Sequence, residues 1–290
     1  MPVVRSPYHS PKATLDQRGL RPRKRFGQNF LVDPRFADRV ADAVPPDAYV
    51  IEIGGGTGAL TAALAARARS VLVLEIDRDL AGVLRERFQG EPTRVEIVET
   101  DAAGFDFAGT LAAQTAPRAV CGNLPYNITT PLIERIVAVT DRWETAVLMV
   151  QREYARRLAA KPGTPDYGSL TVFVAYHCNV EKLFDVGAAG FYPAPSVASS
   201  VVRLTPRPQR AAHVHDEALL LHVIRAAFAQ RRKTLANCLL ARADPSTSKT
   251  AVEAAIRAAG IDERVRGERL DLDAFIRLAN SLAACGIDVA

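Results

Sequence analysis

Short apolar runs alternate with amphipathic segments along the first half of the chain. The runs predict strands over 49–53, 71–77, 95–98, 119–121 and 146–150. Helices are predicted between them, over 59–68, up to residue 88 and over 130–139. Nearly continuous apolar strands that alternate with helices are typical of a parallel sheet in an α/β fold. Two later segments, 180–186 and 197–204, predict an antiparallel pair at the sheet edge, whereas 168–177 fits either a helix or a strand.

The two ends of the chain follow other patterns. Residues 1–22 are rich in Pro, Arg and Ser and have no periodicity, which predicts a disordered arm. A Pro-Arg-Pro-Gln linker at 206–209 is followed by predicted helices over 216–229, 233–242, 249–259 and 271–284. The sequence therefore predicts a basic arm over 1–22, a catalytic α/β domain over 23–205 and a small all-α domain over 206–290.

The positive charge of the chain is concentrated in the arm. Residues 1–25 hold seven basic residues and one acidic residue, so they carry 7 − 1 = +6. The net charge is +5, so the other 265 residues sum to −1. A basic arm on a nearly neutral body suits a polyanion such as RNA, although a merely solubilising tail has the same composition.

Membrane and metal chemistry have little support in the sequence. No apolar run reaches 18 residues and no apolar segment follows the N-terminal charges, so we expect no transmembrane helix and no signal peptide. The four cysteines are widely spaced and form no zinc pattern. We therefore expect a cytoplasmic protein with reduced cysteines and no metal.

A glycine-rich turn follows the first strand. The segment EIGGGTGA, 52–59, lies where a strand gives way to a helix, and glycines there let the backbone approach a ligand. Gly54, Gly56 and Ala59 satisfy the spacing of the dinucleotide fingerprint, but Glu52 would repel a phosphate. A cationic nucleotide without phosphates, such as S-adenosylmethionine, would tolerate that carboxylate. An ordinary tight turn is the alternative.

Acidic residues end the next two strands. Glu75 comes 21 residues after Gly54, a spacing that suits a carboxylate accepting from both ribose hydroxyls. Asp77 is a competitor, although capping of the following helix explains it better. Asp101 is a candidate to accept from the adenine amino group. A helix cap is the alternative for each, but together with the glycine turn they favour a cofactor site.

The segment Asn123-Leu124-Pro125-Tyr126 follows the fourth strand, at the edge of the sheet where such folds bind ligands. Pro125 stiffens the turn, so the Asn123 side-chain oxygen and the Pro125 carbonyl can both accept from one amino group. Tyr126 offers a ring on which a flat base can stack. These groups suit an exocyclic amine whose nitrogen faces a methyl donor. An ordinary loop with a core tyrosine is the alternative.

With these motifs the chain resembles the ribosomal RNA adenine N6 dimethyltransferases. The matching segments, in order, are 26–33 (FGQNFLVD), 52–61, 75–77, 101–102, 122–128 (GNLPYNI), 191–197 (FYPAPSV) and 228–235 (FAQRRKTL). The resemblance implies a Rossmann-like class I S-adenosylmethionine-dependent methyltransferase sheet with a small C-terminal all-α domain. It is strongest to the bacterial small-subunit branch, which dimethylates two adjacent adenosines in a hairpin loop near the 3′ end of 16S rRNA.

The resemblance also implies roles that the residues alone do not. Asn29 and Leu31 would close over the cofactor together with Asn123, and Phe191 would stack on the target adenine opposite Tyr126. The basic N-terminal charge makes Arg23, Lys24 and Arg25, just after the arm, candidates to grip RNA phosphates. The resemblance adds Arg231, Arg232 and Lys233 in a basic helix, for which a solvated charged face is the alternative. The implied partner is 16S rRNA in the immature small ribosomal subunit, with a role in subunit maturation, and the implied state is a monomer.

Two departures from the family pattern matter. Gly55 and Thr57 stand where the family often has Pro and a bulkier residue, and we expect both to be tolerated because neither position needs a reactive side chain. Ser196 stands where the family usually has Lys, which removes one expected phosphate contact.

The implied mechanism is direct transfer, in which the adenine N6 attacks the sulfonium methyl and S-adenosylhomocysteine leaves. Three other functions stay open: methylation of 23S rRNA, a ribosome-assembly factor that acts mainly by binding, and an NAD-dependent oxidoreductase. The last has the least support because nothing in the sequence resembles an acid/base pair for hydride transfer.

Overall fold

The computed structural model describes residues 10–90, 94–207, 213–230 and 232–289. The chain divides into two compact units, one made of 1–155 with 178–206 and the other of 156–177 with 207–290. The sequence placed 156–177 in the catalytic domain, and the structure differs because this segment contributes Tyr167, Val172 and Tyr176 to the apolar core of the helical unit.

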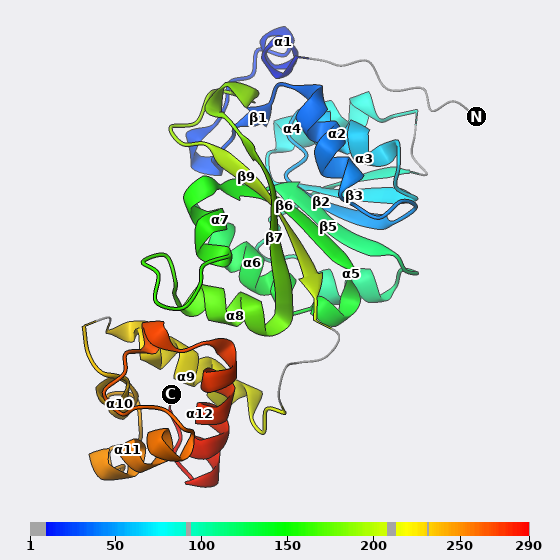
Figure 1. The fold of residues 1–290 in the computed structure, drawn as a ribbon. Helices are drawn as coiled ribbons and strands as arrows, with labels where there is room; N and C mark the ends of the chain where they lie inside the picture. Colours follow the sequence, from blue (N-terminus) through cyan, green and yellow to red (C-terminus); the bar gives the residue numbers. More distant parts are fainter. Residues whose placement is uncertain (1–9, 91–93, 208–212, 231, 290) are drawn as a thin grey trace. The chain divides into compact units, whose positions relative to one another are not determined.

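The first unit is built on a seven-stranded sheet in the described part of the chain (Figure 1). In sheet order its strands are β4 Val95–Glu99, β3 Ser70–Glu75, β2 Tyr49–Ile53, β5 Arg118–Asn123, β6 Thr145–Gln151, β9 Ser199–Pro206 and β7 Cys178–Val186. The first five are parallel, and β9 is antiparallel to both β6 and β7. The predicted parallel sheet and antiparallel edge pair are confirmed, with β7 as the edge strand.

Helices cover the sheet. The bounds are α2 Pro34–Asp42, α3 Ala59–Ala65, α4 Arg78–Arg87, α5 Phe107–Ala112 and α6 Thr129–Val137. Helix α7, Arg152–Leu158, begins in the first unit and ends among residues of the second. Helices α2, α3 and α4 contribute to one apolar core with alternate residues of the central strands, such as Val50, Val73 and Val147. Because alternate residues of a strand point to opposite faces, Glu52 shares the face of Val50 and points toward this helix layer. The sequence pattern did not predict helices α2, α5 and α7.

The part of the arm that is described is ordered, which corrects the prediction of disorder there. Helix α1 spans Pro11–Gln17, and its buried Leu15 packs with Phe30 and Leu80. Residues 1–9 lie outside the described residues. Further along, β1 Phe30–Leu31 pairs antiparallel with β8 Phe191–Tyr192, so the segment after the arm is joined to the loop before β9.

The second unit is helical, as the sequence predicts for residues beyond 206. Its helices are α8 Ser169–His177, α9 Glu217–Ala229, α10 Leu235–Leu240, α11 Lys249–Ala258 and α12 Leu272–Ala284. Their inward residues, among them Leu220, Ile256 and Phe275, are fully buried in one core. The ambiguous segment 168–177 is therefore a helix. None of the helices in the described residues is long and apolar enough to cross a membrane.

Candidate active site

An open pocket lies at the carboxyl ends of β2, β3, β4 and β5. Its lining comes from the segment after the arm, the glycine turn, the ends of β3 and β4 and the loop after β5: residues 26–31, 53–57, 59, 60, 74–76, 80, 100–102, 123–126, 128 and 149. The empty space in the pocket is about 990 Å³, open solvent at its mouth included. The position at the carboxyl edge of a parallel sheet is where α/β folds bind ligands.

The glycine turn forms the floor of this pocket. Gly54, Gly56 and Gly58 all have positive φ, at 77°, 57° and 85°, which side-chain-bearing residues rarely adopt. A Cβ on Gly56 would come within 3.0 Å of the Phe30 ring, whereas a Cβ on Gly54 would meet only the Asn123 carbonyl at 3.8 Å. The backbone at Gly54 is therefore open to a ligand, as the sequence predicts.

Glu75 is held at the end of β3 by two backbone donors. Its Oε2 accepts from the Gly56 amide and its Oε1 from the Asp77 amide, both at 2.9 Å. Burial raises the pKa of this carboxyl, and the two amides act in the opposite direction. Each carboxylate oxygen has a second lone pair, so Glu75 keeps the capacity to accept from a ribose. Asp77 caps α4, as predicted, by accepting from the Asp79 amide at 3.1 Å.

Two neighbouring side chains complete that wall. Asp101 lines the pocket, and its Oδ1 accepts from the Ala103 amide at 2.8 Å. The residue therefore caps a turn and also faces the pocket. Ile76 also lines the pocket and is 43% exposed, unusual for a large aliphatic residue of the described chain. No sequence pattern marks Ile76 as a ligand contact, because it belongs to an apolar run that predicts a buried strand. Its exposed face suits a flat apolar ring.

The Asn123 amide has a defined orientation. Its Nδ2 donates to the backbone carbonyl of Asn29 at 2.9 Å, and Asn29 Nδ2 in turn donates to the Gly27 carbonyl at 3.0 Å. Asn29, Leu31 and Asn123 all line the pocket. Because the Asn123 nitrogen is engaged, its Oδ1 is the atom left to accept from a ligand amino group.

The rest of the 123–126 loop is less simple than the sequence suggests. The Pro125 carbonyl already accepts from the Thr129 hydroxyl at 2.9 Å and from the Ile128 amide at 3.2 Å. A ligand amine would therefore have to share this oxygen with, or displace, the rotatable Thr129 hydroxyl. Tyr126 is half-buried, lines the pocket and shares a hydrogen bond with Ser199.

The expected second stacking platform is not formed in this structure. Phe191 is 4% exposed, belongs to the core cluster on the α2–α4 face and does not line the pocket. The reason is its pairing with Leu31 across the β1–β8 ladder, which turns the ring into the core. Placing Phe191 against a target base would require the 191–197 loop to move.

Glu52 does not face the ligand, which corrects the electrostatic argument drawn from the sequence. Its side chain is fully buried, neither carboxyl oxygen has a hydrogen-bond partner, and it does not line the pocket. Burial raises its pKa to about 8; the nearby Thr61 hydroxyl and Arg87 act in the opposite direction, and Glu75 acts in the same direction as burial. At neutral pH the Glu52 carboxyl is therefore mostly protonated, and it presents no charge to a ligand.

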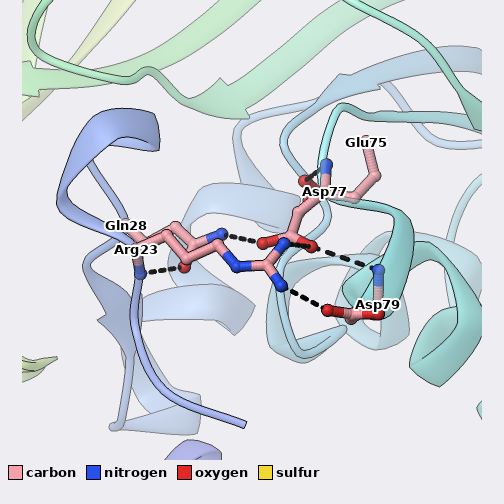
Figure 2. Close-up of polar contacts among 5 residues, drawn as sticks. All are labelled: Arg23, Gln28, Glu75, Asp77 and Asp79. Atoms are coloured by element: carbon pink, nitrogen blue, oxygen red, sulfur yellow. Dashed lines mark hydrogen bonds and ion pairs between the residues drawn. The ribbon is translucent and has the colours of Figure 1, made fainter.

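The basic residues divide into engaged and exposed groups. Arg23 forms ion pairs with Asp77, at 2.7 Å, and with Asp79 (Figure 2). Its guanidinium is therefore engaged within the protein and does not extend freely into solvent. Lys24 and Arg25 are exposed beside it. In the second unit Arg232 and Lys233 are exposed in the connection between α9 and α10, not in a helix. Arg231 lies outside the described residues.

The pocket fits S-adenosylmethionine by its chemistry. It offers a backbone approach at Gly54, a buried acceptor at Glu75, an apolar face at Ile76 and a second acceptor at Asp101. Within the described residues no cluster of His, Cys, Asp and Glu is arranged to hold a metal ion.

Comparisons with known proteins identify the family of the chain. The model of the family described as Ribosomal RNA adenine dimethylase matches residues 19–284. The Ribosomal RNA small subunit methyltransferase A of Aromatoleum aromaticum is 46% identical over 266 residues, which are 91% of this chain and 95% of that protein. The protein of the same name from Geobacillus thermodenitrificans is 42% identical over 277 residues, 93% of this chain and 94% of its own.

Solved structures give the same result. A dimethyladenosine transferase from Plasmodium falciparum superposes with a TM-score of 0.76 at 26% identity, covering 90% of this chain and all of the other. The 23S rRNA methyltransferase ErmE superposes with a TM-score of 0.66 at 30% identity, covering 88% of this chain and all of the other. The predicted class I methyltransferase fold is confirmed.

Proposed function

Because the chain belongs to the ribosomal RNA adenine dimethylase family, we propose that it dimethylates N6 of two adjacent adenosines in a hairpin loop near the 3′ end of 16S rRNA. It is an S-adenosylmethionine-dependent rRNA adenine dimethyltransferase. The curated relatives at 42–46% identity carry small-subunit names, which favours 16S rRNA over other RNAs. The proposed setting is the immature small ribosomal subunit in the cytoplasm, with the enzyme as a monomer.

One observation carries the chemical part of the proposal. The Asn123 amide is fixed by its bond to the Asn29 carbonyl, so its oxygen is presented to the pocket beside Pro125 and Tyr126. An amide oxygen at this position accepts from the exocyclic amine of adenine. Asn29 therefore helps to orient Asn123 through its main chain.

The residues of the chain have separate tasks in this account. S-adenosylmethionine, when bound, supplies a methyl group on a positively charged sulfur. Glu75, Asp101 and Ile76 hold the nucleoside part of the cofactor, and the Tyr126 ring supports the target base. Asn123, with the Pro125 carbonyl once Thr129 releases it, orients the amine, so that the lone pair of N6 faces the methyl group. Positioning of two reactants in this way can supply most of the acceleration.

The target base must leave its stack to reach this pocket. An adenosine in a hairpin loop is only partly stacked, so the cost of extruding it is lower than in a duplex. The exposed cations Lys24, Arg25, Arg232 and Lys233 are the proposed phosphate contacts. Dimethylation further requires that the pocket accept a base that already carries one methyl group.

The similarity to ErmE keeps 23S rRNA as the second candidate substrate. The test is to incubate the protein and methyl-labelled S-adenosylmethionine with small and large subunits from cells that lack these modifications, and to map the labelled nucleotides. We expect label at two adjacent adenosines of 16S rRNA. Label only in 23S rRNA would establish the other substrate. Stable binding to small subunits without label would favour an assembly factor that acts by binding.

A further inference from the structure

A compact polar network lies directly behind Glu75. Asp77 is only 3% exposed, and its two carboxylate oxygens are both used: Oδ1 pairs with the Arg23 guanidinium at 2.7 Å, and Oδ2 accepts from the Gln28 side-chain amide at 2.8 Å. Figure 2 shows these groups converging from the chain after α1 and from the start of α4. The side chain of Asp77 therefore joins two segments that are more than 45 residues apart in sequence.

The main chain of Asp77 extends this network to the cofactor wall. Its amide donates to Glu75 Oε1 at 2.9 Å, so one residue contacts Arg23 and Gln28 through its side chain and Glu75 through its backbone. The Arg23 amide also donates to Gln28 Oε1 at 2.7 Å, which closes a ring of hydrogen bonds. A shift of Asp77 would therefore move a donor that orients Glu75.

Further contacts dock the same segment on α4. Arg23 forms a second ion pair with Asp79, and Arg18 forms one with Glu86. The stretch that follows Arg23, residues 26–31, supplies one wall of the pocket. The docking of Arg23 on Asp77 and Asp79 thus holds both the pocket wall and the Glu75 carboxylate.

We propose that Arg23 and Gln28 are positioning residues for cofactor binding that act through Asp77, and that Arg23 is not a phosphate ligand of the RNA. The proposal rests on the proposed function to the extent that the pocket binds S-adenosylmethionine. Removing the Arg23 guanidinium leaves a nearly buried carboxylate without its cationic partner. Loss of one partner destabilises a protein more than replacement of both, because the remaining charge is left unpaired. Arg94, an exposed arginine just before β4 that does not line the pocket and has no assigned role in binding, serves as the matched control.

The test is the affinity for S-adenosylmethionine and for S-adenosylhomocysteine, measured by titration calorimetry on the full chain without RNA. We expect Arg23→Gln to raise both Kd values about threefold to tenfold and Gln28→Ala to raise them as well, whereas Arg94→Gln should leave them unchanged. Arg23→Lys should recover part of the affinity. A double-mutant cycle of Arg23→Gln with Asp79→Asn should be non-additive, since the two residues are in contact.

A parallel titration with a 16S rRNA hairpin at several salt concentrations separates the two roles of Arg23. A positioning role predicts that Arg23→Gln keeps the wild-type salt slope. Unchanged cofactor Kd values with a salt slope lower by about 1 would overturn the proposal and make Arg23 a phosphate ligand. If Arg23→Gln also lowered the unfolding midpoint reported by Trp143, and Arg23→Lys did not restore cofactor affinity, the role would be only structural. A wild-type protein that bound neither cofactor would instead contradict the proposed function itself.

Discussion

The Tyr126 hydroxyl and the Ser199 hydroxyl lie 2.7 Å apart and share a hydrogen bond. Ser199 is fully buried at the start of β9, between Gln151 of β6 and Val186 of β7. It is therefore a rigid anchor, whereas Tyr126 sits in the loop after β5. Burial raises the pKa of Tyr126, so its hydroxyl stays protonated and available for this bond at neutral pH. The bond fixes the ring on which we place the target base.

Removal of the Ser199 hydroxyl should impair the use of RNA more than the binding of cofactor. We expect Ser199→Ala to lower kcat/KM for the RNA about threefold to tenfold, because an ordinary hydrogen bond contributes about 1 kcal/mol to the ring position. The Kd for S-adenosylmethionine should not change. Tyr126→Phe should show a similar loss, and the double variant should be no worse than either single one. A fully additive double variant would contradict the link.

Glu75→Gln should weaken cofactor binding. Hydrogen bonds to a charged acceptor contribute about 1.5–3 kcal/mol, so we expect the Kd for S-adenosylmethionine to rise about 10- to 100-fold. Glu99 is the matched control, because it pairs with Glu75 in register on the neighbouring strand and is exposed. Titration calorimetry of both variants measures the effect, and an equal Kd for Glu75→Gln and Glu99→Gln would exclude a ribose-binding carboxylate at Glu75.

Glu52→Gln should change how stability depends on pH. The folded pKa of about 8 lies above the unfolded value of 4.5, so between these values the folded state holds a proton that the unfolded state has lost. The stability of the wild type therefore falls as pH rises through this window, by about 1.4 kcal/mol per pH unit relative to the variant.

Urea unfolding from pH 5.5 to 7.5 measures this difference, with the fluorescence of Trp143 as the signal. Trp143 is the single tryptophan and is 2% exposed in the first unit. A difference between wild type and Glu52→Gln that does not vary with pH would show that Glu52 is ionised in the folded protein.

Gly55→Ala should destabilise the first unit. A Cβ at this position would lie 2.4 Å from Val73 Cγ1 and 2.8 Å from Leu84 Cδ1, so core side chains would have to move. Overpacking of this kind costs about 1–3 kcal/mol. Gly82→Ala in α4 is the control, because its Cβ would meet nothing within 4 Å. If both variants unfolded at the same urea concentration, the space at Gly55 would be larger than the structure indicates.

The sheet was predictable from sequence because its strands are long apolar runs between turn residues. Helices α2, α5 and α7 were not, and length alone does not explain this, since α2 has nine residues and the predicted α3 has seven. The boundary between the units was predictable at 206 but not at 156–177, because only packing assigns Tyr167 and Tyr176 to the helical core.

The residues of the site divide in the same way, into those that a local sequence pattern predicts and those that only the fold brings together. Gly54, Glu75, Asp101 and Asn123 were predictable as residues of one pocket because each lies at or just after the end of a strand, at one edge of the sheet. Ser199 and Ile76 belong to no sequence motif, and only the fold shows the contact of Ser199 with Tyr126 and the exposure of Ile76. Arg23 was assigned by charge and Phe191 by resemblance, and the structure places both in intramolecular contacts that no local pattern encodes.

The most direct test of the account is the yield of N6,N6-dimethyladenosine in 16S rRNA for the wild type, Asn123→Ala and Asn179→Ala. Unmethylated small subunits are incubated with each protein and S-adenosylmethionine, and the digested nucleosides are identified by mass. Asn179 is the control because it is an exposed asparagine on the edge strand β7. We predict that Asn123→Ala lowers the rate at least about 100-fold while Asn179→Ala does not. Wild-type yield from Asn123→Ala would contradict the central claim that this amide holds the target amine.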